Sequence, residues 1–296
     1  MTKVLITGSN SFVGSNFRRF SQYKDIVEVS LLNNRPEDIE FNKYDVVLHL
    51  AAIVHQSKKI KEQEYYLINR DLCLRVAELA RRAGVKQFIF LSTVKVYGKF
   101  VQGSDPWNED SYCHPEDAYG KSKYEAELAL RKLEDLGFTV SIVRTPIVYG
   151  PGVKANMLRL IRLIEKVPVL PFKNVNNSRC YTYSGNLIGY IDRIIEINAS
   201  GIFLVMDDSS LSTTDLVTFL AKFLGKRIVL YKVPELFVRF LLSVKTGAVD
   251  RLFGSFFLDN SKTKEFLKYK PLFSNEEGIG KMISYYLETK ASKYLN

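Results

Sequence analysis

Cysteine and histidine are scarce in this chain of 296 residues, which holds three of each. The cysteines are widely separated and no two form a Cys-x-x-Cys pair, so the sequence predicts neither a disulfide framework nor a zinc site. His49 lies inside an apolar run, where a histidine more often packs in the core than binds a ligand. We therefore expect no metal centre and three reduced cysteines, namely Cys73, Cys113 and Cys180.

Long apolar runs are also missing. No stretch reaches the roughly 20 apolar residues that span a bilayer. The chain enters an apolar strand pattern at Lys3 without a basic region or a cleavage site before it. These features predict a cytoplasmic protein with no stable membrane insertion.

The net charge of +10 arises from 42 basic and 32 acidic residues, but the basic residues form no dense block. This even spread argues against nucleic acid as a partner. It suits a cleft that binds phosphorylated small molecules, or weak attraction to an anionic membrane surface. Ordinary solvated lysine-rich faces account for most of the charge.

The hydrophobic fraction of 46% and the charged fraction of 25% are typical of a globular protein, and the length suits two domains. Buried strands followed by helical patterns predict an α/β fold with a Rossmann-type, doubly wound parallel sheet. We place this domain at residues 1–150 and a smaller C-terminal domain at residues 151–296. Because no linker separates them, the boundary is soft and later segments can return to the sheet.

The first apolar strand, Lys3 to Ile6, runs directly into Thr-Gly-Ser-Asn-Ser-Phe-Val-Gly, and a helical pattern begins near Ser15. Strand, glycine turn and helix in this order indicate a dinucleotide-binding site. Gly8 permits the tight turn, Gly14 allows close packing, and the helix N-terminus attracts a pyrophosphate. Ser11 replaces the middle glycine of the usual motif, which weakens the signal. The predicted cofactor-binding residues here are Gly8, Asn10, Ser11, Phe12, Val13 and Gly14.

A second strand is expected from about Ile26 to Leu32, and the residues after it decide how the adenine ribose is held. An acid there binds a 2′-hydroxyl, whereas a cation favours a 2′-phosphate. No acid is found at this strand end and Arg35 is near, so the sequence favours NADPH over NADH, with NAD still possible. Alternatively, Arg35 is only a loop residue before Pro36.

The next buried strand, Tyr44 to Ala52, ends in small residues where the backbone of a cofactor can pass. A helix over residues 65–83 and a strand over residues 87–91 follow, and the latter ends at Ser-Thr-Val-Lys-Val-Tyr-Gly, residues 92–98. The predicted cofactor contacts at the end of the first of these strands are Leu50, Ala51 and Ala52.

A tyrosine and a lysine, Tyr119 and Lys123, stand four residues apart at the start of a helical segment, which places both on one face. We expect the ammonium to lower the pKa of the phenol, so that the tyrosine can exchange a proton with a sugar hydroxyl or carbonyl. The same spacing recurs by chance at Tyr286 and Lys290, where nothing glycine-rich precedes it. That second pair is interpreted as ordinary helix surface.

Taken together, these motifs resemble the extended short-chain dehydrogenase/reductases that act on nucleotide sugars, and the resemblance covers nearly the whole chain. Its marks are Thr-Gly-x-x-x-Phe-Val-Gly, Leu-Ala-Ala, Asn69, Ser-Thr-x-x-Val-Tyr-Gly, Tyr-x-x-x-Lys, and the segment from Arg144 through Val-Tyr-Gly-Pro-Gly. The resemblance implies that Thr93 orients the sugar O4 and that Tyr119 is the acid/base. It further implies that Lys123 holds the nicotinamide ribose and tunes the tyrosine, and it adds Asn69 to the cofactor-binding residues.

The second half resembles the nucleotide-sugar-binding domain of this family. The resemblance implies that Asn156 contacts the nucleotide sugar and that Arg179 and Arg251 bind its diphosphate. Arginine suits this task because its planar fork binds phosphate oxygens bidentately. A capped helix start is expected at residues 211–216, and a late strand or loop at residues 254–259.

Within the family, four segments are similar to bacterial reductases that act on UDP-4-keto-6-deoxy-N-acetylhexosamines for capsule or O-antigen. This similarity implies NADPH-dependent reduction at C4 to UDP-FucNAc or UDP-QuiNAc. Relatives also form homodimers through two helices, which here are residues 65–83 and 119–136.

Two other functions stay open. A UDP-hexose or UDP-N-acetylhexosamine 4-epimerase uses the same threonine, tyrosine and lysine with tightly bound NAD, and a non-catalytic NADP-binding scaffold can share the fold. The resemblance argues against a 4,6-dehydratase, since those relatives carry an Asp-Glu pair where Val94 and Lys95 stand here.

Overall fold

A computed structural model describes residues 1–54, 60–99, 105–233 and 252–292. At its centre is a six-stranded sheet in the order β2-β1-β3-β4-β5-β9, and every neighbouring pair is parallel. The carboxyl ends of all six strands therefore lie at one edge, where ligands of open α/β sheets bind. The strands are β1 (Val4–Thr7), β2 (Ile26–Val29), β3 (Val46–His49), β4 (Gln87–Thr93), β5 (Thr139–Thr145) and β9 (Gly201–Leu204).

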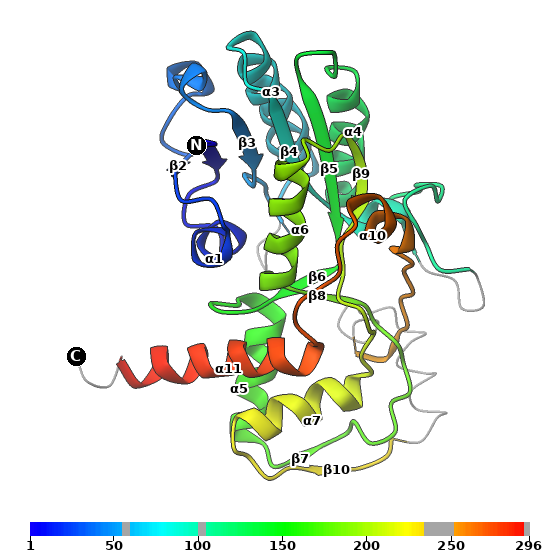
Figure 1. Cartoon of the computed structure of the whole chain (residues 1–296). Coiled ribbons are helices and arrows are strands. Elements are labelled where there is room, and N and C mark those ends of the chain that lie inside the picture. The colour runs from blue at the N-terminus through cyan, green and yellow to red at the C-terminus, as the bar shows by residue number, and fades with distance from the viewer. Residues whose placement is uncertain (55–59, 100–104, 234–251, 293–296) are drawn as a thin grey trace.

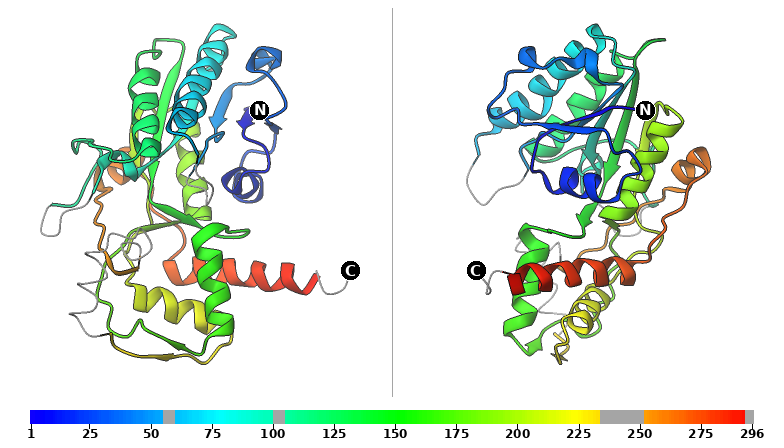
Figure 2. Two further views of the ribbon diagram at one scale, coloured as in Figure 1. Left: turned by 180° about the vertical axis from the view of Figure 1, so that it is seen from behind. Right: turned by 60° about the vertical axis from the view of Figure 1, so that its left-hand side comes forward.

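Helices cover both faces of the sheet (Figure 1, Figure 2). Helices α1 (Phe12–Phe20) and α6 (Ser184–Glu196) pack on one face, and α3 (Cys73–Arg82) and α4 (Ala118–Arg131) pack on the other. The inner strands are buried on both faces, which is why they consist of nearly continuous apolar runs. The predicted α/β class and doubly wound parallel sheet are confirmed.

The long helix expected over residues 65–83 is divided into three segments. It begins as α2 (Glu62–Tyr65), continues as the π-helical segment η3 (Tyr66–Leu72) and ends as α3. A π-helical segment inside a helix often accompanies a functional site. Asn69 lies in this segment.

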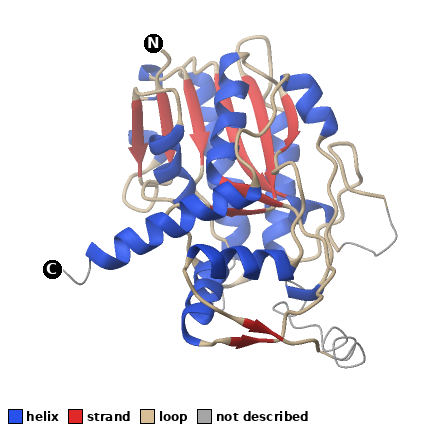
Figure 3. Ribbon diagram, turned by 60° about the horizontal axis from the view of Figure 1, so that its bottom comes forward, coloured by secondary structure: helices blue, strands red, loops and turns tan. Residues whose placement is uncertain are grey.

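A second layer lies beyond the carboxyl edge of the sheet (Figure 1, Figure 3). Its helices are α5 (Ala155–Lys166), α7 (Thr213–Phe223) and α11 (Asn275–Ser292), which share one apolar core. Two short parallel strand pairs belong to it, namely β6 (Ile147–Tyr149) with β8 (Tyr181–Tyr183) and β7 (Val169–Leu170) with β10 (Val229–Leu230). Helix α7 begins as predicted, because Ser212 and Asp215 form a reciprocal capping box.

Three elements after residue 150 belong to the first layer. Helix α6 covers the sheet, β9 pairs with β5, and α10 (Ser261–Leu267) contacts α6. The three remaining short turns of the first layer are 3₁₀ helices: η1 (Pro36–Asp38), η2 (Phe41–Lys43) and η4 (Val94–Tyr97). Across the described ranges, no helix combines the length and apolar character needed to cross a bilayer.

Candidate active site

The turn after β1 brings the chain close to the end of β3. Gly8 has a φ of +96°, and a Cβ there would lie 2.8 Å from the backbone nitrogen of Ala51. Only glycine combines this backbone conformation with so close an approach. The predicted cofactor residues at the ends of β1 and β3 are therefore neighbours in the structure.

Helix α1 begins earlier than expected, at Phe12 instead of near Ser15. The cause is Ser11, which is the N-cap residue and whose hydroxyl accepts a hydrogen bond from the backbone N–H of Gly14 at 3.1 Å. A Cβ on Gly14 would come within 2.8 Å of that hydroxyl. The serine that weakened the sequence motif thus has a local structural role.

The second strand is shorter than predicted, because β2 ends at Val29 instead of Leu32. Ser30 starts a turn in which its carbonyl accepts a hydrogen bond from the Asn34 side chain at 2.8 Å. The residue that follows the strand is therefore a serine and not an acid. Arg35 has a side chain 77% exposed and lies 3.8 Å from the carboxylate of Glu37.

One acid near the glycine turn was not anticipated. Glu28 lies inside β2, and its carboxylate accepts a hydrogen bond from the backbone N–H of Asn10 at 3.0 Å. Asn10 has a φ of +57°, a conformation in which asparagine is tolerated better than most residues. The alternation of side chains along β2 could have indicated that Glu28 lies near the glycine turn. The predicted strand, however, ended at Leu32 instead of Val29, so Glu28 was too far from the predicted strand end to be considered.

Asn69 is fully buried and holds other parts of the site together. Its side chain forms two hydrogen bonds with the backbone of Ile53, at 2.8 and 3.0 Å, and a third with the hydroxyl of Ser122 at 3.1 Å. It thereby joins the segment after β3 to helix α4. This arrangement makes Asn69 a positioning residue for the predicted cofactor segment Leu50–Ala52.

Thr93 and Tyr119 meet at the carboxyl edge of the sheet. Thr93 is the last residue of β4 and Tyr119 lies in the first turn of α4, and their side chains are hydrogen-bonded. The Tyr65 ring makes an edge contact with the Tyr119 ring, with centroids 6.4 Å apart. Burial raises the pKa of Tyr119 to about 12, so the phenol is protonated at neutral pH.

Lys123 is 2% exposed and lies one turn after Tyr119 on α4. Its ammonium nitrogen is 3.8 Å from the centroid of the Phe90 ring, and burial lowers its pKa to about 8. The expectation that the lysine lowers the pKa of Tyr119 does not hold for the protein alone. Loss of hydration dominates the pKa of both groups and moves both toward the neutral form.

A buried ion pair supports this helix from behind. The carboxylate of Glu127, on α4, accepts hydrogen bonds from Arg144 on β5, the shortest at 2.6 Å, and another from the Ser92 hydroxyl. The Glu127 and Arg144 side chains are 1% and 3% exposed. From the sequence, Arg144 is only a family mark and Glu127 has no predicted role, although Glu127 stands four residues after Lys123 and so lies on the same helix face.

A second ion pair joins the turn after β4 to the start of α4. Lys95, in η4, pairs with Asp117, which is the N-cap of α4 and accepts a hydrogen bond from the Gly120 N–H at 2.7 Å. The Lys95 ammonium lies 5.8 Å from the centroid of the Tyr119 ring. From the sequence, the predicted significance of Lys95 is only that it replaces a dehydratase acid, and this ion pair is not predicted.

His49 is 1% exposed, and its Nδ1 is hydrogen-bonded to the Thr7 hydroxyl at 2.8 Å. Burial and the nearby Lys123 charge lower its pKa to about 3, so the ring is neutral. Its surroundings are those of a core histidine. Within the parts of the chain that the structure describes, no group of three or more His, Cys, Asp and Glu side chains could hold a metal.

The residues predicted to bind the nucleotide sugar are less closely gathered. Asn156 is exposed in the first turn of α5. Arg179 forms a backbone bridge with Leu211 and donates from Nη1 to the Gly254 carbonyl at 3.0 Å. Arg251 lies outside the described residues.

The chain was compared with known proteins. The model of the NAD dependent epimerase/dehydratase family matches residues 4–205. A UDP-glucose 4-epimerase from Vibrio cholerae is 35% identical over 96% of this chain and 95% of the relative. An N-acetyl-α-D-glucosaminyl-diphospho-ditrans,octacis-undecaprenol 4-epimerase from Escherichia coli O157:H7 is 26% identical over 76% of this chain and 73% of the relative.

The fold also matches a crystal structure of UDP-glucuronic acid 4-epimerase from Bacillus cereus in complex with NAD. The TM-score is 0.74 at 22% identity, over 97% of this chain and 99% of the other. The family match covers more than half of the chain. The protein therefore belongs to the NAD dependent epimerase/dehydratase family, a group of extended short-chain dehydrogenase/reductases.

Proposed function

We propose that this protein is a UDP-hexose 4-epimerase that works with bound NAD. The observation that carries the proposal is the hydrogen bond between Thr93 and Tyr119 at the end of β4, one turn from the buried Lys123. The Vibrio cholerae relative supports the choice of reaction, since it spans nearly the whole chain and is a UDP-glucose 4-epimerase. This differs from the sequence interpretation, which favoured a 4-ketoreductase and kept the epimerase as its alternative.

In this proposal Tyr119 moves the proton of the sugar O4. It accepts the proton when the C4 hydroxyl is oxidised and returns it when the ketone is reduced from the other face. Thr93 shares a hydrogen bond with Tyr119 and orients O4. Because the pKa of Tyr119 is about 12 in the protein alone, the proton-accepting step requires further positive charge in the assembled site.

The residues at the carboxyl edge fit a nicotinamide dinucleotide. Gly8 leaves no side chain between the β1 turn and the end of β3, and Ser11 fixes the N-terminus of α1, which can bind the pyrophosphate. Ser30 follows β2 where the adenine ribose would be held, and Lys123 would hold the nicotinamide ribose. When bound, NAD accepts the hydride from C4 and returns it to the opposite face.

The second candidate is the NADPH-dependent C4 reduction of a UDP-4-keto-6-deoxy-N-acetylhexosamine. One observation favours it: a serine instead of an acid follows β2. A reductase protonates the nascent O4 only once per turnover, so the neutral phenol of Tyr119 suits it directly. From the resemblance to the family, we also propose that the protein is cytoplasmic. We further propose that it forms a homodimer through η3, α3 and α4.

The test is a pair of incubations with the purified protein. With UDP-glucose alone, we expect UDP-galactose to appear by chromatography without net change in absorbance at 340 nm. With UDP-4-keto-6-deoxy-N-acetylglucosamine and NADPH, we expect no absorbance loss coupled to product. Stoichiometric loss of absorbance in the second incubation, with no reaction in the first, would replace the epimerase by the reductase.

A further inference from the structure

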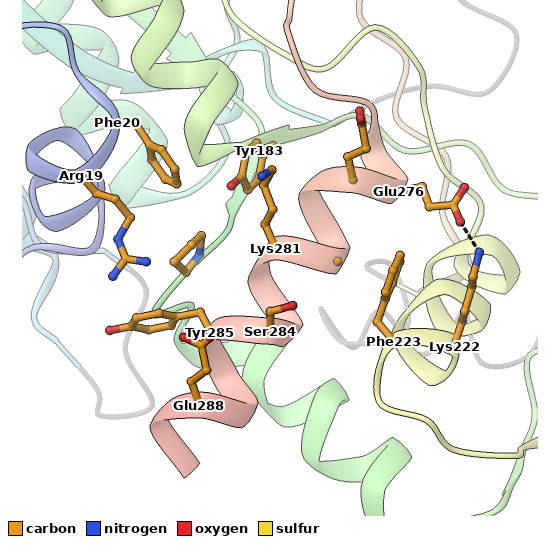
Figure 4. A pocket seen from close by; sticks show the side chains of 13 residues that line it. Arg19, Phe20, Tyr183, Lys222, Phe223, Glu276, Lys281, Ser284, Tyr285 and Glu288 are labelled. Carbon is orange, nitrogen blue, oxygen red and sulfur yellow. Dashed lines mark hydrogen bonds and ion pairs between the residues drawn. The ribbon is translucent and has the colours of Figure 1, made fainter. Parts of the chain in front are cut away.

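A cavity of about 770 Å³ lies between α1, α7 and α11, and no residue of the predicted catalytic or cofactor set lines it (Figure 4). Helix α11 forms its floor through Gly280 and Ser284. Arg19 and Phe20 of α1 lie on one side, and Lys222 and Phe223 of α7 lie on the other. The volume is in the range of small-ligand sites.

The positive groups on the α1 side lack carboxylate partners. Lys222 is ion-paired with Glu276 at 2.6 Å, whereas neither Arg19 nor Lys281 forms an ion pair with any part of the chain that the structure describes. The Arg19 guanidinium lies 4.4 Å from the centroid of the Tyr285 ring, a cation–π contact. A guanidinium offers a fork of donors suited to an anion.

A buried hydroxyl points into the same side of the cavity. Tyr183 is 0% exposed, and its Oη has no hydrogen-bond partner among the described residues. In Figure 4 this hydroxyl is directed toward the space bounded by Phe20 and Arg19. A buried hydroxyl without a partner is costly, and a ligand oxygen would satisfy it.

The acidic side chains at the cavity define where an anion can bind. Glu276 is neutralised by Lys222, and Glu277 accepts hydrogen bonds from the backbone N–H and the hydroxyl of Ser274, each at 2.8 Å. Glu288 lies beyond Tyr285 at one end of the cavity (Figure 4). Glu277 lies one turn before Lys281 on α11 and interacts with its charge, so an anion is most favoured on the α1 side, close to Arg19.

We infer that this cavity is a second ligand site, which binds the phosphate group of a nucleotide-sized molecule. Arg19, Lys281 and the Tyr183 hydroxyl hold the phosphate, and the rings of Phe20 and Phe223 contact the remainder. Phosphate fits the donor set better than a neutral sugar does, because Arg19 and Lys281, which form no ion pair in the described ranges, both line the cavity. The site shares α1 with the predicted cofactor turn but none of its residues.

Amine labelling of the whole protein tests this site without relying on activity. The rate of Lys281 acetylation is measured by peptide mass spectrometry with and without UMP, and separately with inorganic phosphate. We expect UMP to slow the labelling of Lys281 at least fivefold in the wild type. If inorganic phosphate protects Lys281 at the same concentration as UMP does, the site binds free phosphate and not a nucleotide. If neither molecule protects Lys281, the inference is wrong.

Three variants test whether UMP protects Lys281 from within this cavity. Arg19→Ala should raise the UMP concentration that gives half-maximal protection by roughly ten- to hundredfold, the usual effect on affinity of removing one charged hydrogen bond. Arg82→Ala removes the same charge from the exposed end of α3 and should leave the protection unchanged. If Arg19→Ala keeps full protection, UMP acts from elsewhere and the inference is wrong. Glu288→Gln removes a nearby negative charge and should strengthen protection.

Discussion

Two Tyr-x-x-x-Lys pairs in this protein share one spacing and have opposite surroundings. Tyr286 and Lys290, on α11, both contact the carboxylate of Glu165 on α5, at 2.7 and 2.6 Å. Tyr119 and Lys123, on α4, face the carboxyl edge of the sheet, and Lys123 forms no ion pair within the described ranges. The Tyr286–Lys290 pair joins two helices, whereas the Tyr119–Lys123 pair lies at the edge where Thr93 shares a hydrogen bond with Tyr119.

Burial distinguishes the α4 pair, which we propose to be catalytic, from the α11 pair. The Lys290 side chain is 42% exposed, whereas Lys123 is 2% exposed and lies against the Phe90 ring. A charge held in an apolar site interacts more strongly with a bound ligand than one in water. Residue spacing thus places a tyrosine and a lysine on one helix face, and the surrounding packing decides what they can do.

The largest difference between the pairs should appear in turnover. Tyr119→Phe removes the proposed proton carrier and should lower the turnover number by about 10²- to 10⁴-fold, with cofactor binding nearly unchanged. Tyr286→Phe should leave turnover unchanged and cost about 1 kcal/mol of unfolding free energy through its bond to Glu165. Steady-state kinetics and urea unfolding measure both effects. A greater loss of turnover in Tyr286→Phe would invert the assignment.

The carboxylates behind the two pairs should differ in their contribution to stability. Glu127→Ala leaves Arg144 buried without its partner and should lower the unfolding free energy by about 3 to 5 kcal/mol. Glu165→Ala removes a partly exposed partner and should cost about 1 kcal/mol. Urea denaturation compares the two directly. Equal losses would mean that the Glu127–Arg144 pair does not hold α4 on the sheet.

The two lysines should give stability changes of opposite sign. The folded pKa of Lys123 is about 8, below its ordinary value of 10.5, so burial of the charge costs about 3 kcal/mol below pH 8. Lys123→Met should therefore stabilise the protein at pH 7, and this gain should shrink as pH rises from 8 to 10.5. The same variant should lose affinity for NAD. Lys290→Met should instead destabilise slightly, by under about 1 kcal/mol.

Urea unfolding at pH 7 and pH 10 tests the sign of the lysine effect, and calorimetric titration with NAD tests binding. A Lys123→Met protein that binds NAD as tightly as the wild type would remove the ribose role of this lysine.

The smallest effect concerns cofactor choice. Arg35→Ala should weaken NADPH binding by less than about tenfold and leave NADH binding unchanged, because the side chain is exposed and lies near Glu37. Fluorescence titration with the two reduced cofactors measures the ratio. Equal losses for both would mean that Arg35 only shapes the loop.

Local features of the site could be predicted from the sequence, and features made by distant residues could not. The glycine turn, the capped start of α7 and the Tyr119–Lys123 face depend on residues a few positions apart. The Glu127–Arg144 pair depends on how α4 packs against β5, which no local pattern specifies. The sequence predicted that β2 ends at Leu32, whereas it ends at Val29. The reason is that the hydrogen bond between Asn34 and Ser30 forms a turn there in place of further pairing between strands.

The fate of the C4 hydrogen tests the proposed epimerase most directly. UDP-glucose labelled with deuterium at C4 is incubated with the purified protein, and the products are analysed by mass spectrometry. The account predicts UDP-galactose that keeps the deuterium at C4, and no such product from Tyr119→Phe. Loss of the deuterium to solvent, or no conversion of UDP-glucose while a 4-keto sugar consumes NADPH, would contradict it.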